Sequence, residues 1–248
     1  AMGIRGLSSW LDHYADGAPE MTVLSRGGAL LIDGCGWAFH LLNELPAAAR
    51  LSDYAALDAV VQAHIAAIRS AGLVPTCYFD GRSTRLKLST IERRRRQRCD
   101  RWEILMAACL DGRRVAVQDA PEPLLILEQV QASLEAAHVR IVHCDGEADA
   151  ELARACIAIC GGGEASVLGD DSDFLLYAGV RYVRFAELVI SEDKVIKARA
   201  QSQSVNQPVS HWRACTSHLG LGADVEYARA VDSCHGDPST NCSFGQHR

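Results

Sequence analysis

Residues 144–177, CDGEADAELARACIAICGGGEASVLGDDSDFLLY, contain two clusters of acidic residues separated by one apolar segment. The first cluster precedes 150–160, whose spacing predicts a helix that is apolar on most faces. The second follows 165–168, a short apolar run typical of a buried strand. Carboxylates packed this closely raise one another's pKa unless a cation lies between them. Helix caps and acidic turns are the alternative explanation, because Asp favours both positions.

The composition fits one sizeable α/β domain, because 248 residues that are 48% hydrophobic can bury a large core. A net charge of −6 excludes polyanion binding over the whole surface, so any nucleic-acid contact must come from a local basic region. Ten scattered cysteines without a CxxC pair indicate reduced thiols in a nuclear or cytoplasmic protein. No apolar run approaches the ~18 residues that a membrane span needs, so we expect no membrane partner. We expect a monomer.

Apolar strand candidates alternate with helical patterns, which predicts a mostly parallel, twisted sheet with helices on both faces. The expected strands are 29–32, 74–79, 139–143, 165–168 and 180–185. The expected helices are 37–45, 53–71, 102–110, 121–134, 150–160 and 192–199.

The chain changes character near its end, which divides it into two parts. Residues 2–200 form the expected main α/β domain, with a basic segment at about 82–110. Residues 201–248 begin with a polar linker and continue as a weakly patterned segment, for which we expect only short helices near 212–219 and 225–231.

Acidic residues follow four of the expected strands. Asp33, Asp80 and Asp171 each end an apolar run, and Glu147 and Asp149 follow another. The carboxyl ends of parallel strands meet at one edge of a sheet, where ligands bind. Carboxylates without neighbouring His or Cys suit Mg²⁺ or Mn²⁺, and enough of them for two ions suggests two-metal hydrolysis of a phosphodiester.

The segment 82–101, RSTRLKLSTIERRRRQRCDR, carries nine Lys or Arg residues against two acidic ones. It directly follows Asp80, so we expect it to hold a phosphate backbone beside the acidic edge. A solvated helix face is the alternative. The expected nucleic-acid contacts are Arg82, Arg85, Lys87, Arg93, Arg94, Arg95, Arg96 and Arg98.

Five short motifs in consistent order resemble the flap-endonuclease-like nucleases of the xeroderma-pigmentosum-G type, and most closely their asteroid family. The motifs are MGIRGL at 2–7, IDG at 32–34, FDG at 79–81, GEADA at 146–150 and VLGDDSDF at 167–174. The resemblance covers roughly residues 2–185. It implies a three-layer PIN-like fold and a divalent-metal nuclease that acts on single-stranded, flap or fork DNA in DNA repair, with RNA as an alternative substrate.

The resemblance also implies roles for individual residues. The residues implied to bind a first Mg²⁺ or Mn²⁺ ion are Asp33, Asp80, Glu147 and Asp149. Asp171 and Asp173 would bind a second ion, with Asp149 as a bridge. Lys87 and Arg94 occupy the positions of two gateway-helix residues that stabilise charge on the scissile phosphate, and Gly3 would lie near the site.

The C-terminal part departs from the family pattern. The relatives carry one more metal-binding Asp in a Gly-x-Asp motif, for which Asp237 is the best candidate and Asp232 the fallback. In flap endonucleases a helix-hairpin-helix type clamp would come next, beyond Arg248, the last residue of this sequence. We therefore keep a second hypothesis, a catalytically inactive PIN-like module that binds nucleic acid or serves as a scaffold. A zinc site built from Cys and His of 211–247 is a minor third hypothesis.

Overall fold

The structure is a computed structural model, and it describes residues 22–24, 26–46, 49–83, 87–113, 121–177, 179–190, 196–198 and 201–202. The chain divides into two units, Ala1–Gln203 and Ser204–Arg248, and the described residues all belong to the first. Gly3, Arg85, Asp232, Asp237, the two short C-terminal helices and the hypothetical zinc site lie outside the described residues.

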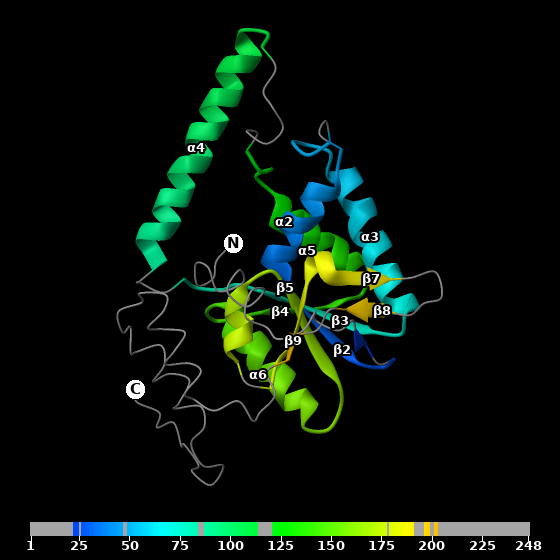
Figure 1. Cartoon of the computed structure of the whole chain (residues 1–248). Helices are drawn as coiled ribbons and strands as arrows, with labels where there is room; N and C mark the ends of the chain where they lie inside the picture. The colour runs from blue at the N-terminus through cyan, green and yellow to red at the C-terminus, as the bar shows by residue number, and fades with distance from the viewer. Residues whose placement is uncertain are drawn as a thin grey trace, which may run out of the picture. The chain divides into compact units, whose positions relative to one another are not determined.

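The centre of the described domain is a six-stranded sheet with the order β4-β3-β2-β5-β6-β9 (Figure 1). The strands are β2 (Ala29–Asp33), β3 (Val74–Phe79), β4 (Arg140–His143), β5 (Ala165–Gly169), β6 (Arg181–Arg184) and β9 (Gln201–Ser202). The first five are mutually parallel, and only β9 runs antiparallel to its neighbour β6. The predicted mostly parallel sheet is confirmed.

Helices cover both faces of this sheet (Figure 1). The helices α2 (Gly34–Glu44), α3 (Tyr54–Ser70) and α5 (Ile126–Ala136) pack together on one face, and α6 (Ala148–Cys160) packs on the other. Along β2, Leu30 and Ile32 belong to the core beneath α2, α3 and α5, whereas Leu31 belongs to the core beneath α6. Because side chains alternate along a strand, both faces of the central strand are buried and the domain has three layers.

The strand order reverses beside β2. The chain moves from β2 outward to β3 and β4, then returns to β5 on the opposite side of β2. This reversal makes the gap between the carboxyl ends of β2 and β5 a topological switch point, the usual place for a ligand in an open parallel sheet. Asp33 ends β2, and Asp171 follows β5 closely.

A small second sheet corrects one sequence prediction. The helix expected at 192–199 is wrong for the part of that range that the structure describes, because Ile196–Ala198 form β8 between β1 (Thr22–Val23) and β7 (Leu188–Ile190). Antiparallel partners on both sides satisfy the backbone of β8, and this pairing overrides a weak helical pattern. Gln201 and Ser202, which the sequence suggests to be linker, pair with β6.

The basic segment forms one continuous helix, α4 (Leu88–Leu110), instead of the shorter helix expected at 102–110. The run contains no Gly or Pro and is rich in Arg, Glu and Gln, which are good helix formers. Only Leu105 and Ala108 of this helix are buried, so its arginines face solvent. Within the described residues, no helix combines the length and the apolar character needed to cross a membrane.

Candidate active site

Asp33 ends β2 and begins α2 at the same residue. Its Oδ1 accepts a hydrogen bond from the Gly36 N–H at 3.0 Å, so α2 starts three residues before the helix expected at 37–45. The pKa of Asp33 rises from 3.8 to about 6, mainly because of burial; the charges of Asp80 and Asp170 contribute to the rise, and the backbone N–H groups of Gly36 and Cys35 oppose it. Capping alone does not require this environment, because an exposed Asp would cap equally well.

Gly36 allows this close approach. A Cβ at residue 36 would overlap with Asp33 Oδ2 and would lie 3.3 Å from the Phe185 ring. We therefore expect Gly36→Ala to push the Asp33 carboxylate out of place and to lower the rate of any metal-dependent reaction at least ~10-fold. Folding stability should change little, because Ala is the better helix former by ~1 kcal/mol.

The effect of Gly36→Ala is measured as reaction rate and thermal unfolding, with Gly162→Ala as control, since a Cβ at Gly162 meets nothing within 4 Å. An unchanged rate in Gly36→Ala would show that the position of Asp33 is unimportant.

Asp80 joins the loop after β3 to the loop after β4 at the carboxyl edge of the sheet. It follows β3, and its Oδ1 accepts a hydrogen bond from the Ala148 N–H at 2.8 Å at the start of α6. Next to it the Gly81 N–H donates to the Gly146 carbonyl at 2.7 Å. Only glycine fits at 81, because a Cβ there would overlap with the Cys144 carbonyl oxygen. The loops that follow β3 and β4 are therefore fixed against each other.

Asp149, in the first turn of α6, has the highest pKa of the described carboxyl groups that are clearly shifted. Burial is the largest cause, and the negative charges of Asp171, Asp33 and Asp80 add to it, so that the pKa rises to about 7. Glu147 precedes it as an extended N-cap residue, with φ −76° and ψ 139°. This turn of the chain lets both acids reach one edge, although residues two apart do not share a helix face.

Asp171 follows β5, and its Oδ1 accepts a hydrogen bond from the Asp173 N–H at 3.0 Å at the start of η3 (Ser172–Leu176). Burial raises the pKa of Asp171 to about 6; the Asp173 N–H opposes this, while the charges of Asp173 and Asp33 add to it. Asp173 thus affects the pKa of Asp171 in two opposite ways, through its backbone N–H, which lowers it, and through its charge, which raises it.

The structure therefore brings four of the candidate carboxylates together at the switch point, where Asp149 and Asp33 each interact electrostatically with the other members. The four carboxylates are Asp33, Asp80, Asp149 and Asp171, hereafter the acidic cluster. Glu147 forms an ion pair with Lys87, whose Nζ lies 2.6 Å from its Oε2. Among the described residues, no three His, Cys, Asp or Glu side chains already stand in ligating positions.

The donor set of the acidic cluster still fits a hard divalent cation. All four ligand candidates are carboxylates, the type that Mg²⁺ and Mn²⁺ prefer. The raised pKa values of Asp33, Asp149 and Asp171 reflect desolvation and repulsion that a bound cation would relieve. No thiol of the cluster's neighbourhood competes as a thiolate, since burial raises the pKa of Cys35 to about 12.

Lys87 links the basic helix to the acidic cluster. It is the residue before α4, and besides its ion pair with Glu147 it lowers the pKa of Asp149 and Asp171. The remaining described basic candidates are exposed: Arg82 before α4, and Arg93, Arg94, Arg95, Arg96 and Arg98 along it. Arg96 pairs with Glu92 at 2.6 Å, and Arg98 lies 3.7 Å from Glu122.

Asp170 is a neighbour of the site that the sequence reasoning left out of its ligand set. Its Oδ1 accepts a hydrogen bond from the Phe185 N–H at 3.2 Å, which ties the end of β5 to η4 (Phe185–Glu187), and its charge raises the pKa of Asp33. The signal was present in the sequence, since Asp170 is the first acid after the strand.

No protein-family model matches the sequence. No curated protein matches it either. Among solved structures, human GEN1 in complex with Holliday junction DNA matches with a TM-score of 0.50 and 14% identity, over 92% of this chain and 50% of that one. The catalytic core of Rad2 in complex with DNA substrate matches with a TM-score of 0.47 and 16% identity, over 79% and 55%. The T5 D15 protein co-crystallised with metal ions matches with a TM-score of 0.41 and 15% identity, over 64% and 55%.

The likeness to GEN1 extends over most of this chain and concerns the fold, which is the PIN-like three-layer fold expected from the sequence. The chain spans about half the length of the solved structures that it matches.

Proposed function

We propose that this protein is a divalent-metal-dependent nuclease of the flap-endonuclease type, most similar to the asteroid family. The acidic cluster carries the proposal: four carboxylates, from the ends of four elements, gather at the switch point of a parallel sheet, and the pKa values of Asp33, Asp149 and Asp171 are raised there by burial and by neighbouring negative charges. A group of acids with perturbed pKa values at such a switch point is typical of a catalytic centre. The order of the five motifs supports the same assignment.

In this proposal the acidic cluster holds Mg²⁺ or Mn²⁺, with Glu147 and Asp173 as further ligands and Asp149 between two ions. When bound, such ions activate water and stabilise the leaving oxygen of a phosphodiester. Lys87 contributes a positive charge at the edge of the cluster, where the negative charge of the scissile phosphate increases during hydrolysis. Arg94 and the exposed arginines of α4 hold the backbone of the substrate.

The substrate that fits this proposal is DNA with a single-stranded, flap or fork element, with RNA as an alternative. GEN1, in the structure described above, is bound to Holliday junction DNA, and Rad2 to a DNA substrate. A basic helix beside a metal site suits a single strand, whose backbone it can follow. We propose further that the protein acts as a monomer in the nucleus or cytoplasm, where its cysteines stay reduced; the seven described ones form no disulfide.

The direct test is cleavage of a labelled panel in Mg²⁺ or Mn²⁺: single-stranded DNA, a 5′ flap, a splayed fork, plain duplex and single-stranded RNA. An Asp171→Asn/Asp173→Asn double variant is assayed beside the wild type. Cleavage that disappears in the variant supports the nuclease and identifies its substrate. Cleavage that is equal in both comes from a contaminant and contradicts the proposal.

A second function, a nucleic-acid-binding module without turnover, is favoured by one observation. Among the described side chains none form a ready trio of metal ligands, and Glu147 is held by Lys87. This hypothesis requires binding to the same panel, no cleavage in either metal, and at most one weak Mn²⁺ site by calorimetry.

Lys87 offers a separate test of the catalytic proposal. Lys87→Met keeps the length of the side chain and removes its charge, so we expect the single-turnover cleavage rate to fall by about 10²-fold with little change in DNA affinity. The control is Arg113→Met, which breaks a comparable ion pair at 2.9 Å with Asp111, outside the acidic cluster. A loss of affinity with an unchanged rate would instead assign Lys87 to substrate binding.

A further inference from the structure

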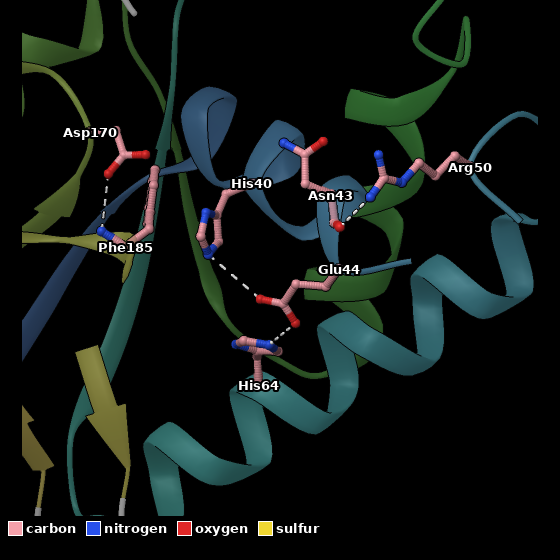
Figure 2. A network of polar contacts seen from close by, with 7 residues as sticks. All are labelled: His40, Asn43, Glu44, Arg50, His64, Asp170 and Phe185. Atoms are coloured by element: carbon pink, nitrogen blue, oxygen red, sulfur yellow. Dashed lines mark hydrogen bonds and ion pairs between the residues drawn. The ribbon is translucent and has the colours of Figure 1, made fainter. Parts of the chain in front are cut away.

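A cavity of about 440 Å³ lies between α2, α3 and the segment 185–188. Its lining includes the apolar side chains of Trp37, Phe185 and Leu188 and the polar side chains of His40, Glu44 and His64. None of these residues has a role in the proposed nuclease site. The three polar residues come together from two helices, as Figure 2 shows.

The two imidazoles approach the two oxygens of one carboxylate. His40 Nε2 lies 3.6 Å from Glu44 Oε1, and His64 Nε2 lies 2.9 Å from Glu44 Oε2. His40 and Glu44 are four residues apart on α2 and therefore share a face, while His64 reaches them from α3. All three side chains are about one-third exposed, so ions in solution have access to them.

The surrounding structure holds each of these side chains. The His40 ring stacks on the Phe185 ring, with the two ring centroids 5.0 Å apart. The Trp37 and His64 rings meet edge-on, with their centroids 6.1 Å apart. Glu44 is the last residue of α2, where Arg50 donates a hydrogen bond to the Asn43 carbonyl at 2.6 Å (Figure 2) and another to the Leu45 carbonyl at 3.0 Å. The end of the helix that carries Glu44 is thus fixed.

We propose that His40, Glu44 and His64 form a binding site for one transition-metal ion of the Zn²⁺ type, separate from the acidic cluster. Two imidazoles and one carboxylate are a ligand set that Zn²⁺ uses and that Mg²⁺ does not prefer. The two imidazole nitrogens approach different oxygens of one carboxylate, at 3.6 Å from Glu44 Oε1 for His40 and at 2.9 Å from Glu44 Oε2 for His64.

Binding requires a local rearrangement, because the three described side chains contact one another directly and are not yet in ligating positions. An ion would replace the contacts between Glu44 and the two imidazoles with bonds to itself. Water from the cavity would supply the fourth ligand. The ion would join α2 to α3, and α2 is the helix that begins at Asp33. The inference goes beyond the nuclease proposal and does not depend on it.

The test is equilibrium dialysis of the full chain against Zn²⁺ in excess Mg²⁺, followed by metal analysis. The variants are His64→Ala and Glu44→Gln, and the control is His143→Ala, an exposed histidine on β4. We expect one equivalent of Zn²⁺ to be lost in the two variants and retained in the control. The thiols and the other acidic side chains that bind Zn²⁺ are the same in all four proteins. A difference in bound Zn²⁺ between them therefore comes from the site of His40, Glu44 and His64.

Co²⁺ provides a second readout, because a tetrahedral Co²⁺ site absorbs visible light far more strongly than an octahedral one. The wild type and His143→Ala should show this absorption, and Glu44→Gln should lack it. Glu44→Gln is nearly isosteric, so its fold can be verified by thermal unfolding even if His64→Ala fails to fold. Equal Zn²⁺ content and equal Co²⁺ absorption in wild type and Glu44→Gln would overturn the proposal.

Discussion

Asp33→Asn is expected to lower the single-turnover cleavage rate in Mg²⁺ by about 10³-fold or more, with no loss of folding stability. The Asn side-chain oxygen can still accept the hydrogen bond from the Gly36 N–H, and Asn caps helices as well as Asp does. The substitution removes the negative charge from a buried position where the acidic cluster would bind a cation. Removing a single group that stabilises transition-state charge already costs about 10²–10³-fold, and a direct metal ligand should cost more.

The chain provides a closely matched control for this variant. Asp53 caps α3 in the same manner, with its Oδ1 accepting a hydrogen bond from the Ala56 N–H at 2.9 Å, and it is exposed. Asp53→Asn therefore makes the same change at a helix start outside the acidic cluster. We expect its cleavage rate to stay within about twofold of the wild type. If both variants lost activity equally, the effect would come from helix capping, and Asp33 would have no metal-binding role.

The sequence was sufficient for the location of the acidic cluster. Asp33, Asp80 and Asp171 follow continuous apolar strands, and parallel strands bring their carboxyl ends to one edge whatever the details of packing. The same reasoning predicted the sheet and the helices on both its faces, because alternation of strands and helices leaves few arrangements. The roles of the individual carboxylates stay predictions.

Other features depend on contacts between residues that are far apart in the sequence. The ion pair between Lys87 and Glu147 joins α4 to the start of α6, and neither residue's pattern indicates the other. His64 meets Glu44 only because α3 packs beside α2. The strand β8 was mistaken for a helix because its partners, β1 and β7, come from distant segments. Local pattern carries no information about such partners.

The acidic cluster should make the stability of the metal-free protein depend on pH with a definite sign. Asp149 has a pKa of about 7 in the folded chain against an ordinary value of 3.8, so the folded state binds more protons than the unfolded state between these values. The free energy of unfolding should therefore fall as pH rises from about 4 to about 7. Above about pH 7, Asp149 should cause little further change. Asp33 and Asp171, with pKa values of about 6, shift stability in the same direction.

Asp149→Asn is expected to make the metal-free protein more stable at about pH 8, by on the order of 3 kcal/mol, since each unit of pKa shift corresponds to 1.36 kcal/mol. Denaturant unfolding at several pH values in EDTA measures this, and the fall in stability between about pH 4 and 7 should become shallower in the variant. Mg²⁺ should raise the unfolding temperature of the wild type, because a cation cancels the repulsion within the acidic cluster, and should raise that of the variant much less.

Asp53→Asn again serves as control. We expect its folding stability to depend on pH, and its unfolding temperature to respond to Mg²⁺, as in the wild type. A variant that is less stable than the wild type at about pH 8, with an unchanged response to Mg²⁺, would mean that Asp149 is compensated by groups of the protein itself. The acidic cluster would then be a structural feature. If the variant gains stability but loses cleavage, the charge of Asp149 destabilises the metal-free wild type and is required only by the metal-bound, active protein.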